Sequence, residues 1–191
     1  TEIYTLSLHD ALPIWKPNIR NRSAAGKEGV LPHAIFIHGL ESGNQGTKAV
    51  YFRERFPKML TPQFDGALVE RMEVLEDILE PLEHLTLVGS SFGGLMAALF
   101  AMLHPEKVCQ IILLAPAIHL ISASTYPIRP IPTPAILFHG IQDEVIPIDK
   151  VEPLSRELFQ HLSFHRVEDD HFLHRTFRSI PWPLYLAPIQ K

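Results

Sequence analysis

The sequence predicts a single α/β domain built around a mainly parallel sheet. Short apolar segments rich in β-branched residues alternate along the chain with segments that have helical periodicity. Several of the apolar segments are continuous rather than alternating, which is typical of strands covered by helices on both faces. Strands and crossover helices in this succession form an open parallel sheet, and 191 residues suffice for one core of this kind.

The predicted domain covers residues 33–191. The first fourteen residues, TEIYTLSLHDALPI, resemble a common sequencing adapter translated in one reading frame. We therefore expect residues 1–14 to be a non-native segment, in which case a natural upstream segment, including any signal peptide, could be missing. Residues 15–32 are expected to be a polar leader.

Composition and charge narrow the possible partners. With 17 basic and 21 acidic side chains the net charge is −4, and no run of Lys or Arg is present, which disfavours nucleic acid and anionic lipid as partners. The longest apolar runs, such as residues 111–115, are far shorter than the roughly 18 residues of a membrane span. The single cysteine, Cys109, is expected to be a buried structural thiol, and one cysteine without an intrachain partner favours a cytoplasmic location.

The elements follow in order from residue 33. HAIFIHGL (33–40) predicts a buried strand that ends in a glycine turn. A loop then leads to a short helix closed by Pro57, and residues 59–64 predict a weaker strand. The short helix carries four apolar residues: Val50, Tyr51, Phe52 and Phe56.

Residues 67–85 predict an amphipathic helix, because apolar residues recur at spacings of three and four. Those residues are Leu68, Met72, Leu75, Leu79 and Leu82. The alternation continues in the second half of the chain, with strands at 85–89, 107–118, 135–141 and 162–167 and helices at 91–104 and about 148–161.

The segment GSSFGG, residues 89–94, lies between a predicted strand and a predicted helix. Gly89 and Gly93 flank Ser91 at two residues on each side, the Gly-x-Ser-x-Gly pattern of a nucleophilic serine on a sharp turn. Glycines suit such a turn because a Cβ atom would prevent the close approach of its backbone. Alternatively, Ser91 only caps the helix. The strand-turn-helix setting favours the catalytic interpretation.

A serine hydroxyl is a weak nucleophile, so Ser91 needs a base to take its proton and an acid to orient that base. In such sites the acid and then the histidine follow the serine along the chain. Asp143 lies just after the predicted strand 135–141, and His171 follows the last predicted strand. The loops at the carboxyl ends of parallel strands meet. The sequence therefore predicts Ser91 as nucleophile, Asp143 as acid and His171 as general base.

Neighbouring residues offer alternatives for two of these roles. Glu144 competes with Asp143 as the acid, and His174, one turn beyond His171, competes with it as the base. Asp143 and His171 stay the predicted acid and base, with Glu144 and His174 as the alternatives. A substitution at each residue would distinguish them, because only the residue that contacts the base or the nucleophile is needed for turnover.

Several of the eleven histidines are not expected to bind metal or take part in catalysis. The pair at 171 and 174, together with Asp169 and Asp170, could suggest a metal site, but the other potential ligands have no recognisable spacing, so no metal is expected. His161 and His165 fall at a predicted helix end and on a predicted strand, and both are interpreted as structural.

The segment HGLES, residues 38–42, follows the first predicted strand. A turn at this position can provide one backbone N–H of an oxyanion hole, and the residue after the nucleophile provides the other. The Leu40 and Phe92 amides are therefore the predicted oxyanion donors. Alternatively, His38 and Gly39 only make a tight turn.

With HGLES, GSSFGG, HGIQDEVIP and DDH in this order, the chain resembles the α/β-hydrolase superfamily, in particular its small, cap-poor bacterial esterase-like members. The resemblance covers about residues 33–175. It implies a three-layer α/β-hydrolase fold, the roles given above, and an acyl-enzyme intermediate formed without metal or organic cofactor. Strands that usually precede the first one are absent or cut off, and the proline-rich SIPWPLYLAPIQK is not expected to form a long closing helix.

The resemblance also bears on the substrate. Related dehalogenases and epoxide hydrolases have an aspartate at the nucleophile position, so a serine there points to acyl transfer from esters, thioesters or amides. Residues 119–133 are too few for a separate lid domain. We therefore expect an open, shallow pocket lined partly by Leu120, Ile121 and Tyr126, with a small-molecule ester or thioester of short or medium acyl length as the partner.

Three functions are compatible with these residues: a serine hydrolase that cleaves esters or thioesters, an acyltransferase with the same triad, and a non-catalytic binding protein of the same fold. The presence of all three triad residue types at three predicted loops favours an enzyme.

Overall fold

A computed structural model of the chain describes residues 33–123 and 126–187. In this part five strands form one parallel sheet in the order β1-β2-β3-β4-β5, and the predicted α/β class is confirmed. The predicted segments 1–14 and 15–32 lie outside the described residues. The strands are β1 (His33–Ile37), β2 (Leu85–Ser90), β3 (Val108–Leu114), β4 (Ala135–Gly140) and β5 (Leu162–Val167).

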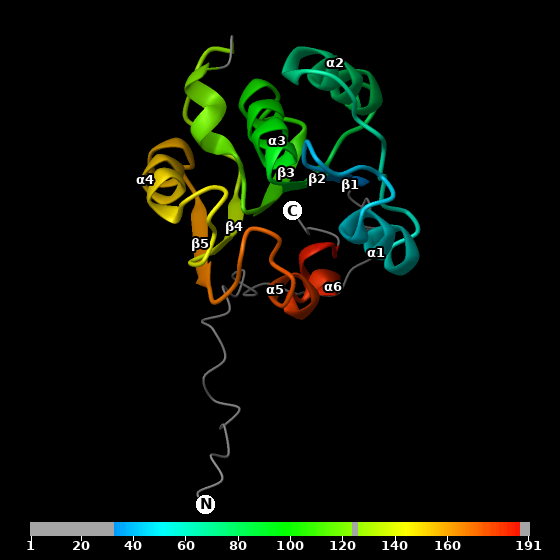
Figure 1. The fold of residues 1–191 in the computed structure, drawn as a ribbon. Coiled ribbons are helices and arrows are strands. Elements are labelled where there is room, and N and C mark those ends of the chain that lie inside the picture. The colour runs from blue at the N-terminus through cyan, green and yellow to red at the C-terminus, as the bar shows by residue number, and fades with distance from the viewer. Residues whose placement is uncertain (1–32, 124–125, 188–191) are drawn as a thin grey trace, which may run out of the picture.

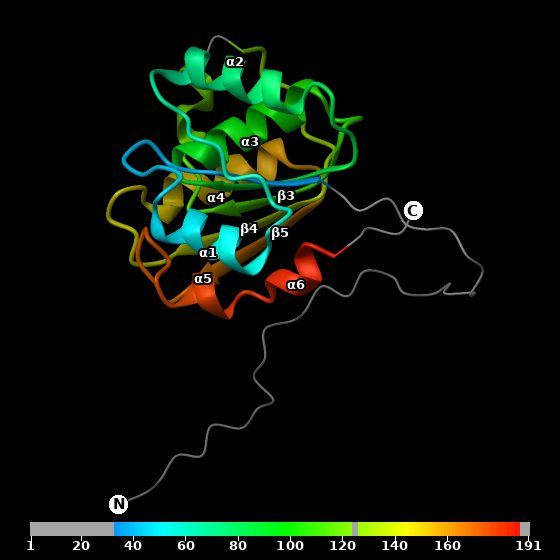
Figure 2. The same ribbon diagram turned by 90° about the vertical axis from the view of Figure 1, so that its right-hand side faces the viewer.

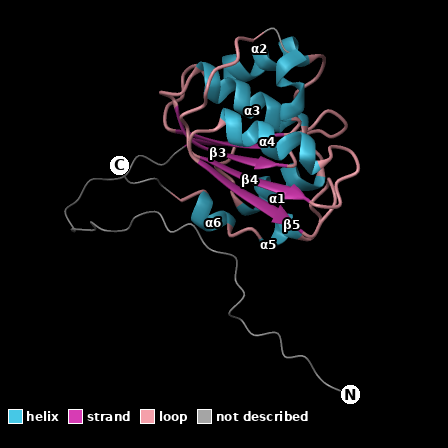
Figure 3. Ribbon diagram, turned by 90° about the vertical axis from the view of Figure 1, so that its left-hand side faces the viewer, coloured by secondary structure: helices cyan, strands magenta, loops and turns pink. Residues whose placement is uncertain are grey.

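Helices cover both faces of the sheet, and Figure 2 shows the three layers from the side. One hydrophobic cluster joins a face of the sheet to three helices: α2 (Leu68–Leu79), α3 (Phe92–Leu103) and α4 (Ile148–Leu158). A second cluster joins the other face to α1 (Thr47–Arg55), α5 (Thr176–Ser179) and α6 (Trp182–Tyr185). All strands run in one direction (Figures 1 and 3), so the loops that follow them gather at one edge of the sheet.

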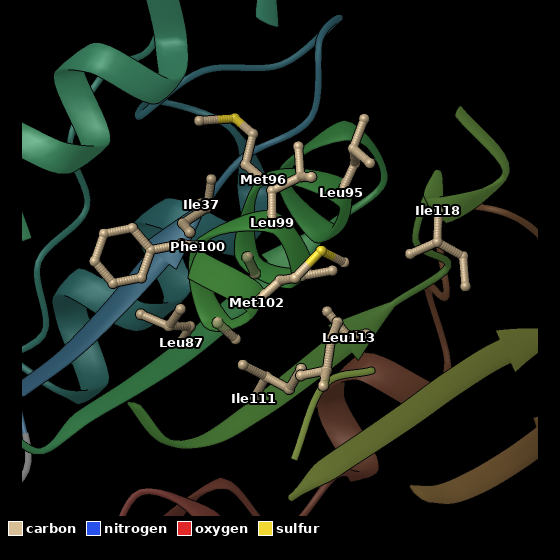
Figure 4. Close-up of a cluster of buried hydrophobic side chains, with 14 of the residues drawn as sticks. Ile37, Leu87, Leu95, Met96, Leu99, Phe100, Met102, Ile111, Leu113 and Ile118 are labelled. Carbon is tan, nitrogen blue, oxygen red and sulfur yellow. The ribbon is translucent and has the colours of Figure 1, made fainter. Parts of the chain in front are cut away.

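The central helix α3 is apolar on all sides, and every residue from Gly93 to Met102 is buried. A helix of this kind needs apolar cover all around it. Figure 4 shows Leu99 and Phe100 of α3 above Leu87 and Ile111 of the sheet. This packing fixes the first turn of α3 relative to the ends of the strands. Despite its apolar surface, α3 is too short to cross a membrane, and no other described helix is long and apolar enough to do so.

Three predicted elements differ from the structure, the first being the strand predicted at 107–118, which ends at Leu114 as β3. Residues 59–64 do not form a strand: only Leu60 pairs with β1, as an isolated bridge to Ile35, and Pro62 lacks the N–H that would extend the pairing. The amphipathic helix ends at Leu79 rather than at residue 85, because Pro81 has no N–H to donate and its ring opposes a continued helix.

Cys109 is half-buried rather than buried as predicted. It lies near the amino end of β3, where Gln110 is also half-buried, whereas the residues from Ile111 to Leu114 are buried. The thiol Sγ lies 3.9 Å from Nδ1 of His84. His165, interpreted as structural, stacks on Phe138 of the neighbouring strand with ring centroids 4.7 Å apart.

Candidate active site

Ser91 lies on the turn between β2 and α3 with φ 54° and ψ −118°. This is a region that residues other than glycine rarely adopt, and it is found at functional sites. The Ser91 N–H donates to the carbonyl oxygen of Leu114 at 2.9 Å, and the Ser91 carbonyl accepts the N–H of Ala117 at 2.9 Å. The end of β3 and the segment just after it therefore hold the turn in its strained form. Ser91 is the N-cap residue of α3, but its hydroxyl makes no capping hydrogen bond with the helix and faces His171 instead.

Two glycines make this turn possible. A Cβ atom on Gly89 would lie 2.4 Å from the carbonyl oxygen of Gly93, and one on Gly93 would lie 2.0 Å from the carbonyl oxygen of Ile37. Both distances are far below any van der Waals contact. The flanking glycines of the GSSFG pattern are therefore required by close backbone approach.

The side chain of His171 lies between those of Ser91 and Asp143. Its Nε2 is 3.1 Å from Ser91 Oγ, and its Nδ1 is 2.8 Å from Oδ2 of Asp143. An ionised carboxylate only accepts hydrogen bonds, so Nδ1–H donates to it and Nε2 faces the serine hydroxyl as the acceptor. The structure thus brings together the three residues predicted as a triad, from the loops after β2, β4 and β5.

The two alternative residues lie elsewhere. Glu144 is exposed to solvent and makes no hydrogen bond with His171, although it follows Asp143 directly. His174 is also exposed, and its ring stacks on Phe172 with centroids 5.4 Å apart. Geometry therefore favours the original assignment of acid and base over both alternatives.

The carboxylate of Asp143 is fully buried. Its Oδ1 accepts the amides of Val145 at 3.0 Å and Ile146 at 2.7 Å. Burial by itself raises the pKa of this group, but the hydrogen bonds from His171 and from the Ile146 amide outweigh burial and lower the pKa of Asp143 below its ordinary value. The group is therefore an anion at neutral pH and can stabilise a protonated imidazole.

Asp169 and Asp170 hold the loop that carries His171. Asp169 Oδ2 accepts two amides, the shorter bond at 2.8 Å from Thr176, and Asp170 Oδ1 accepts two, the shorter at 2.9 Å from Phe172. Both carboxylates are therefore used by the backbone around the histidine. No group of three potential metal ligands occurs among the residues that the structure describes.

The amides predicted as oxyanion donors, those of Leu40 and Phe92, have no hydrogen-bond partner in the described part of the chain. Both residues line the cavity that contains Ser91. The turn before Leu40 is fixed by His38, whose Nδ1 donates to the carbonyl of Gly39 at 2.7 Å and whose Nε2 accepts the Phe64 amide at 3.0 Å. The two free amides can donate hydrogen bonds to a new oxygen partner, and their catalytic role stays a prediction.

Ser91 and His171 open into a cavity of about 640 Å³. Many of its lining side chains are apolar, and four of them are exposed at the surface although large: Leu40, Leu120, Val145 and Phe172. Lys48 and Arg178 also line it, from α1 and α5. The cavity can hold an apolar group next to the serine hydroxyl.

Of the three residues predicted for the pocket, Leu120 lines the cavity and the other two do not. Ile121 is 1% exposed and belongs to the core around α3. The two residues diverge because they are successive positions of a short 3₁₀ helix, η1 (Ile118–Ala123). Tyr126 packs against the same core. In the described part of the connection between β3 and β4, η1 is the only regular element, in agreement with the predicted lack of a lid domain.

Comparison with known proteins agrees with this architecture. A family model for the alpha/beta hydrolase fold matches residues 64–128. Mouse alpha/beta hydrolase domain-containing protein 10 superposes with a TM-score of 0.63 at 22% identity, over 78% of this chain and 86% of that one. The chain has the α/β-hydrolase fold.

Two bacterial proteins of similar structure also have the α/β-hydrolase architecture found here. Est1E from Butyrivibrio proteoclasticus has a TM-score of 0.65 at 17% identity, with 81% of this chain and 85% of that one covered. The esterase EaEST from Exiguobacterium antarcticum has a TM-score of 0.64 at 14% identity, with 79% and 89% covered. None of the curated proteins compared with the chain matches it significantly in sequence.

One residue at this α/β-hydrolase site was not found by sequence reasoning. Lys48 Nζ donates to the carbonyl oxygen of Phe172 at 2.7 Å and lies 5.6 Å from the centre of the Phe177 ring. It therefore joins α1 to the residue that follows His171. The two partners are 124 residues apart. No local pattern in the sequence connects them.

Proposed function

We propose that the protein is a serine hydrolase that cleaves carboxylic ester or thioester bonds with Ser91, His171 and Asp143 as its catalytic triad. The observation that carries the proposal is the continuous contact from Asp143 Oδ2 through the His171 ring to Ser91 Oγ, at 2.8 and 3.1 Å. The hydrolase fold and the esterases among the structural neighbours support it at a coarser level.

In the first half of the proposed reaction, Ser91 Oγ attacks the carbonyl carbon of the substrate while His171 Nε2 takes the hydroxyl proton. The negative charge that develops on the carbonyl oxygen is stabilised by the amides of Leu40 and Phe92. The protonated ring of His171 stays beside the carboxylate of Asp143. It then gives its proton to the leaving alcohol or thiol, which leaves an acyl group on Ser91.

In the second half, His171 takes a proton from a water molecule, whose oxygen attacks the acyl carbon. The same two amides hold the new oxyanion, and collapse of this intermediate returns the proton to Ser91 and releases the acid. All proton transfers occur at Nε2 of His171, because Nδ1 stays bonded to Asp143. This route uses no metal ion and no organic cofactor.

We propose substrates with a short or medium acyl group, because the described part of the connection between β3 and β4 has only η1 and no lid that would cover a long acyl chain. Apolar side chains such as Leu120 and Val145 line the cavity of about 640 Å³ beside Ser91. Est1E, which has the same fold, is described in complex with ferulic acid, a small carboxylic acid. We therefore expect hydrolysis to peak well below the chain length of palmitate.

The test combines covalent labelling with turnover, using the full chain. A fluorophosphonate probe should label the wild type and Ser90→Ala but not Ser91→Ala, because only an activated Ser91 attacks the probe. p-Nitrophenyl esters from acetate to palmitate should be hydrolysed by the same two proteins. Folded wild type that is neither labelled nor active would make the protein a non-catalytic member of this fold, and turnover that peaks at palmitate would contradict the proposed substrate size.

A further inference from the structure

His139 is the penultimate residue of β4 and begins the segment HGIQD, which ends in Asp143. Its side chain is fully buried. The Nε2 atom lies 2.8 Å from the carbonyl oxygen of Ile146 and 3.3 Å from Oδ2 of Asp143. The same Oδ2 atom accepts the hydrogen bond from His171. Two histidine rings therefore lie against one carboxylate oxygen.

The hydrogen bond with Ile146 fixes the tautomer of the His139 ring. A carbonyl oxygen can only accept, so Nε2 carries the proton and Nδ1 has none. Burial lowers the pKa of His139, which favours this neutral ring. The Nδ1 atom is buried and has no hydrogen-bond partner in the part of the chain that the structure describes.

An unpartnered buried acceptor is costly, because it loses its hydrogen bonds with water and gains none in the protein. A phenylalanine at position 139 would fill a similar volume without this cost. If position 139 served only for packing, an imidazole would therefore be a poor choice. The imidazole of His139 is explained instead by its Nε2–H group, which bonds the Ile146 carbonyl and lies beside Asp143.

The contacts around Asp143 indicate what this N–H group does. Oδ1 accepts two amides, and Oδ2 has the hydrogen bond from His171 on one side and the His139 N–H at 3.3 Å on the other. By holding the carbonyl of Ile146, His139 also closes the loop that supplies one of those amides. The carboxylate cannot rotate without loss of these contacts.

We propose that His139 is a positioning residue, which holds the Asp143 carboxylate in the orientation that receives the Nδ1–H of His171. The inference rests on the proposed serine hydrolase function. His139 does not itself line the cavity and makes no hydrogen bond with Ser91, but its partner Ile146 does line it, so an Asp143→Asn background separates an effect through Asp143 from one through Ile146.

Steady-state kinetics of three variants test this role. His139→Phe should lower kcat about 10- to 100-fold, as expected for a small misplacement of a catalytic group, with KM changed less than about threefold. His139→Gln keeps an N–H group that can reach Ile146 and should retain most of the activity. In an Asp143→Asn background, His139→Phe should cause no further loss, because the carboxylate that it orients is gone. Equal losses in both backgrounds, or equal losses for Gln and Phe, would overturn the proposal.

His165→Phe is the matched control. This half-buried histidine stacks on Phe138 but contacts no member of the triad, so its replacement should change the melting temperature and leave kcat unchanged. If His139→Phe does not fold, His139→Gln and the measurement that follows still decide the question.

Nuclear magnetic resonance of the protein with ¹⁵N-labelled histidine rings gives a readout that needs no turnover. Asp143→Asn should shift the Nε2–H signal of His139, identified by its loss in His139→Gln, and Glu144→Gln should not. A His139 signal that Asp143→Asn leaves unmoved would overturn the proposal. A shifted signal in a protein without any hydrolase activity would uphold the contact with Asp143 and refute the proposed function.

Discussion

The carbonyl oxygen of Ile37 lies directly against the Cα atom of Gly93, so close that a Cβ atom there would be 2.0 Å from it. Ile37 ends β1, and the turn that follows it carries Leu40, whereas Gly93 is in the first turn of α3, two residues after Ser91. This contact therefore joins the backbone of the proposed oxyanion hole to that of the proposed nucleophile.

Gly93→Ala should destabilise the protein by about 3 kcal/mol, the cost of inserting an atom into a filled space. This predicted loss of stability is opposite to the effect of helix propensity, which by itself favours alanine over glycine by about 1 kcal/mol inside a helix. Gly43→Ala is the control, because its Cβ would meet only the flexible end of the Gln63 side chain. Urea unfolding measures both variants. A Gly93→Ala protein as stable as the wild type would mean that the two backbones can separate without cost.

Asp143→Asn should leave the fold intact and lower kcat by a factor of about 10⁴, because an amide at this place no longer fixes the required tautomer of His171. Glu144→Gln should have little effect, since that side chain is exposed and does not contact His171. Hydrolysis of a p-nitrophenyl ester by both variants, with circular dichroism to verify folding, is the measurement. The reverse result would assign the acid to Glu144.

The sequence allowed site residues to be predicted where they lie in a loop that directly follows a strand. Ser91, Asp143 and His171 could be predicted because each follows an apolar segment, and parallel strands deliver such loops to one edge of the sheet. The glycines of GSSFGG could be interpreted for the same reason, as local requirements of a strand-turn-helix connection.

Contacts between distant segments could not be predicted in this way. Ile121 and Leu120 are equally apolar, and only the direction of the short η1 helix sends one to the core and the other to the cavity. Residues 59–64 have the composition of a strand, but their pairing with β1 stops after Leu60. The hydrogen bond of Lys48 with Phe172 depends on how α1 and α5 pack together on one face of the sheet.

Lys48→Met should lower kcat about tenfold or more with a smaller change in KM, because the loop with His171 loses the bond that joins it to α1. Lys48→Arg keeps a donor and should recover part of the activity. Lys58→Met, a change at an exposed lysine just beyond α1, is the control for loss of charge. If Lys48→Arg and Lys48→Met lose activity equally, the bond with Phe172 does not position the loop.

His38 should make the stability of the protein depend on pH. Burial lowers the pKa of its ring, the Gly39 carbonyl and Asp65 oppose this effect, and the charge of Arg71 adds to it. The ring is neutral in the fold, because Nδ1–H donates to Gly39 and the bare Nε2 accepts the Phe64 amide. In the unfolded chain the same ring takes up a proton near its ordinary pKa of about 6.5.

Between these two pKa values the unfolded state binds more protons than the folded state, so the free energy of unfolding falls as the pH falls below about 6.5. One such group contributes at most about 1.4 kcal/mol per pH unit. The half-buried His165, whose pKa is also lowered by burial, acts in the same direction. His38→Gln can keep an acceptor for the Phe64 amide without a titrating ring, so its unfolding free energy should fall less steeply than that of the wild type. Urea unfolding from pH 7.5 to 5.0 measures both slopes, and identical slopes would mean that His38 is protonated within the fold.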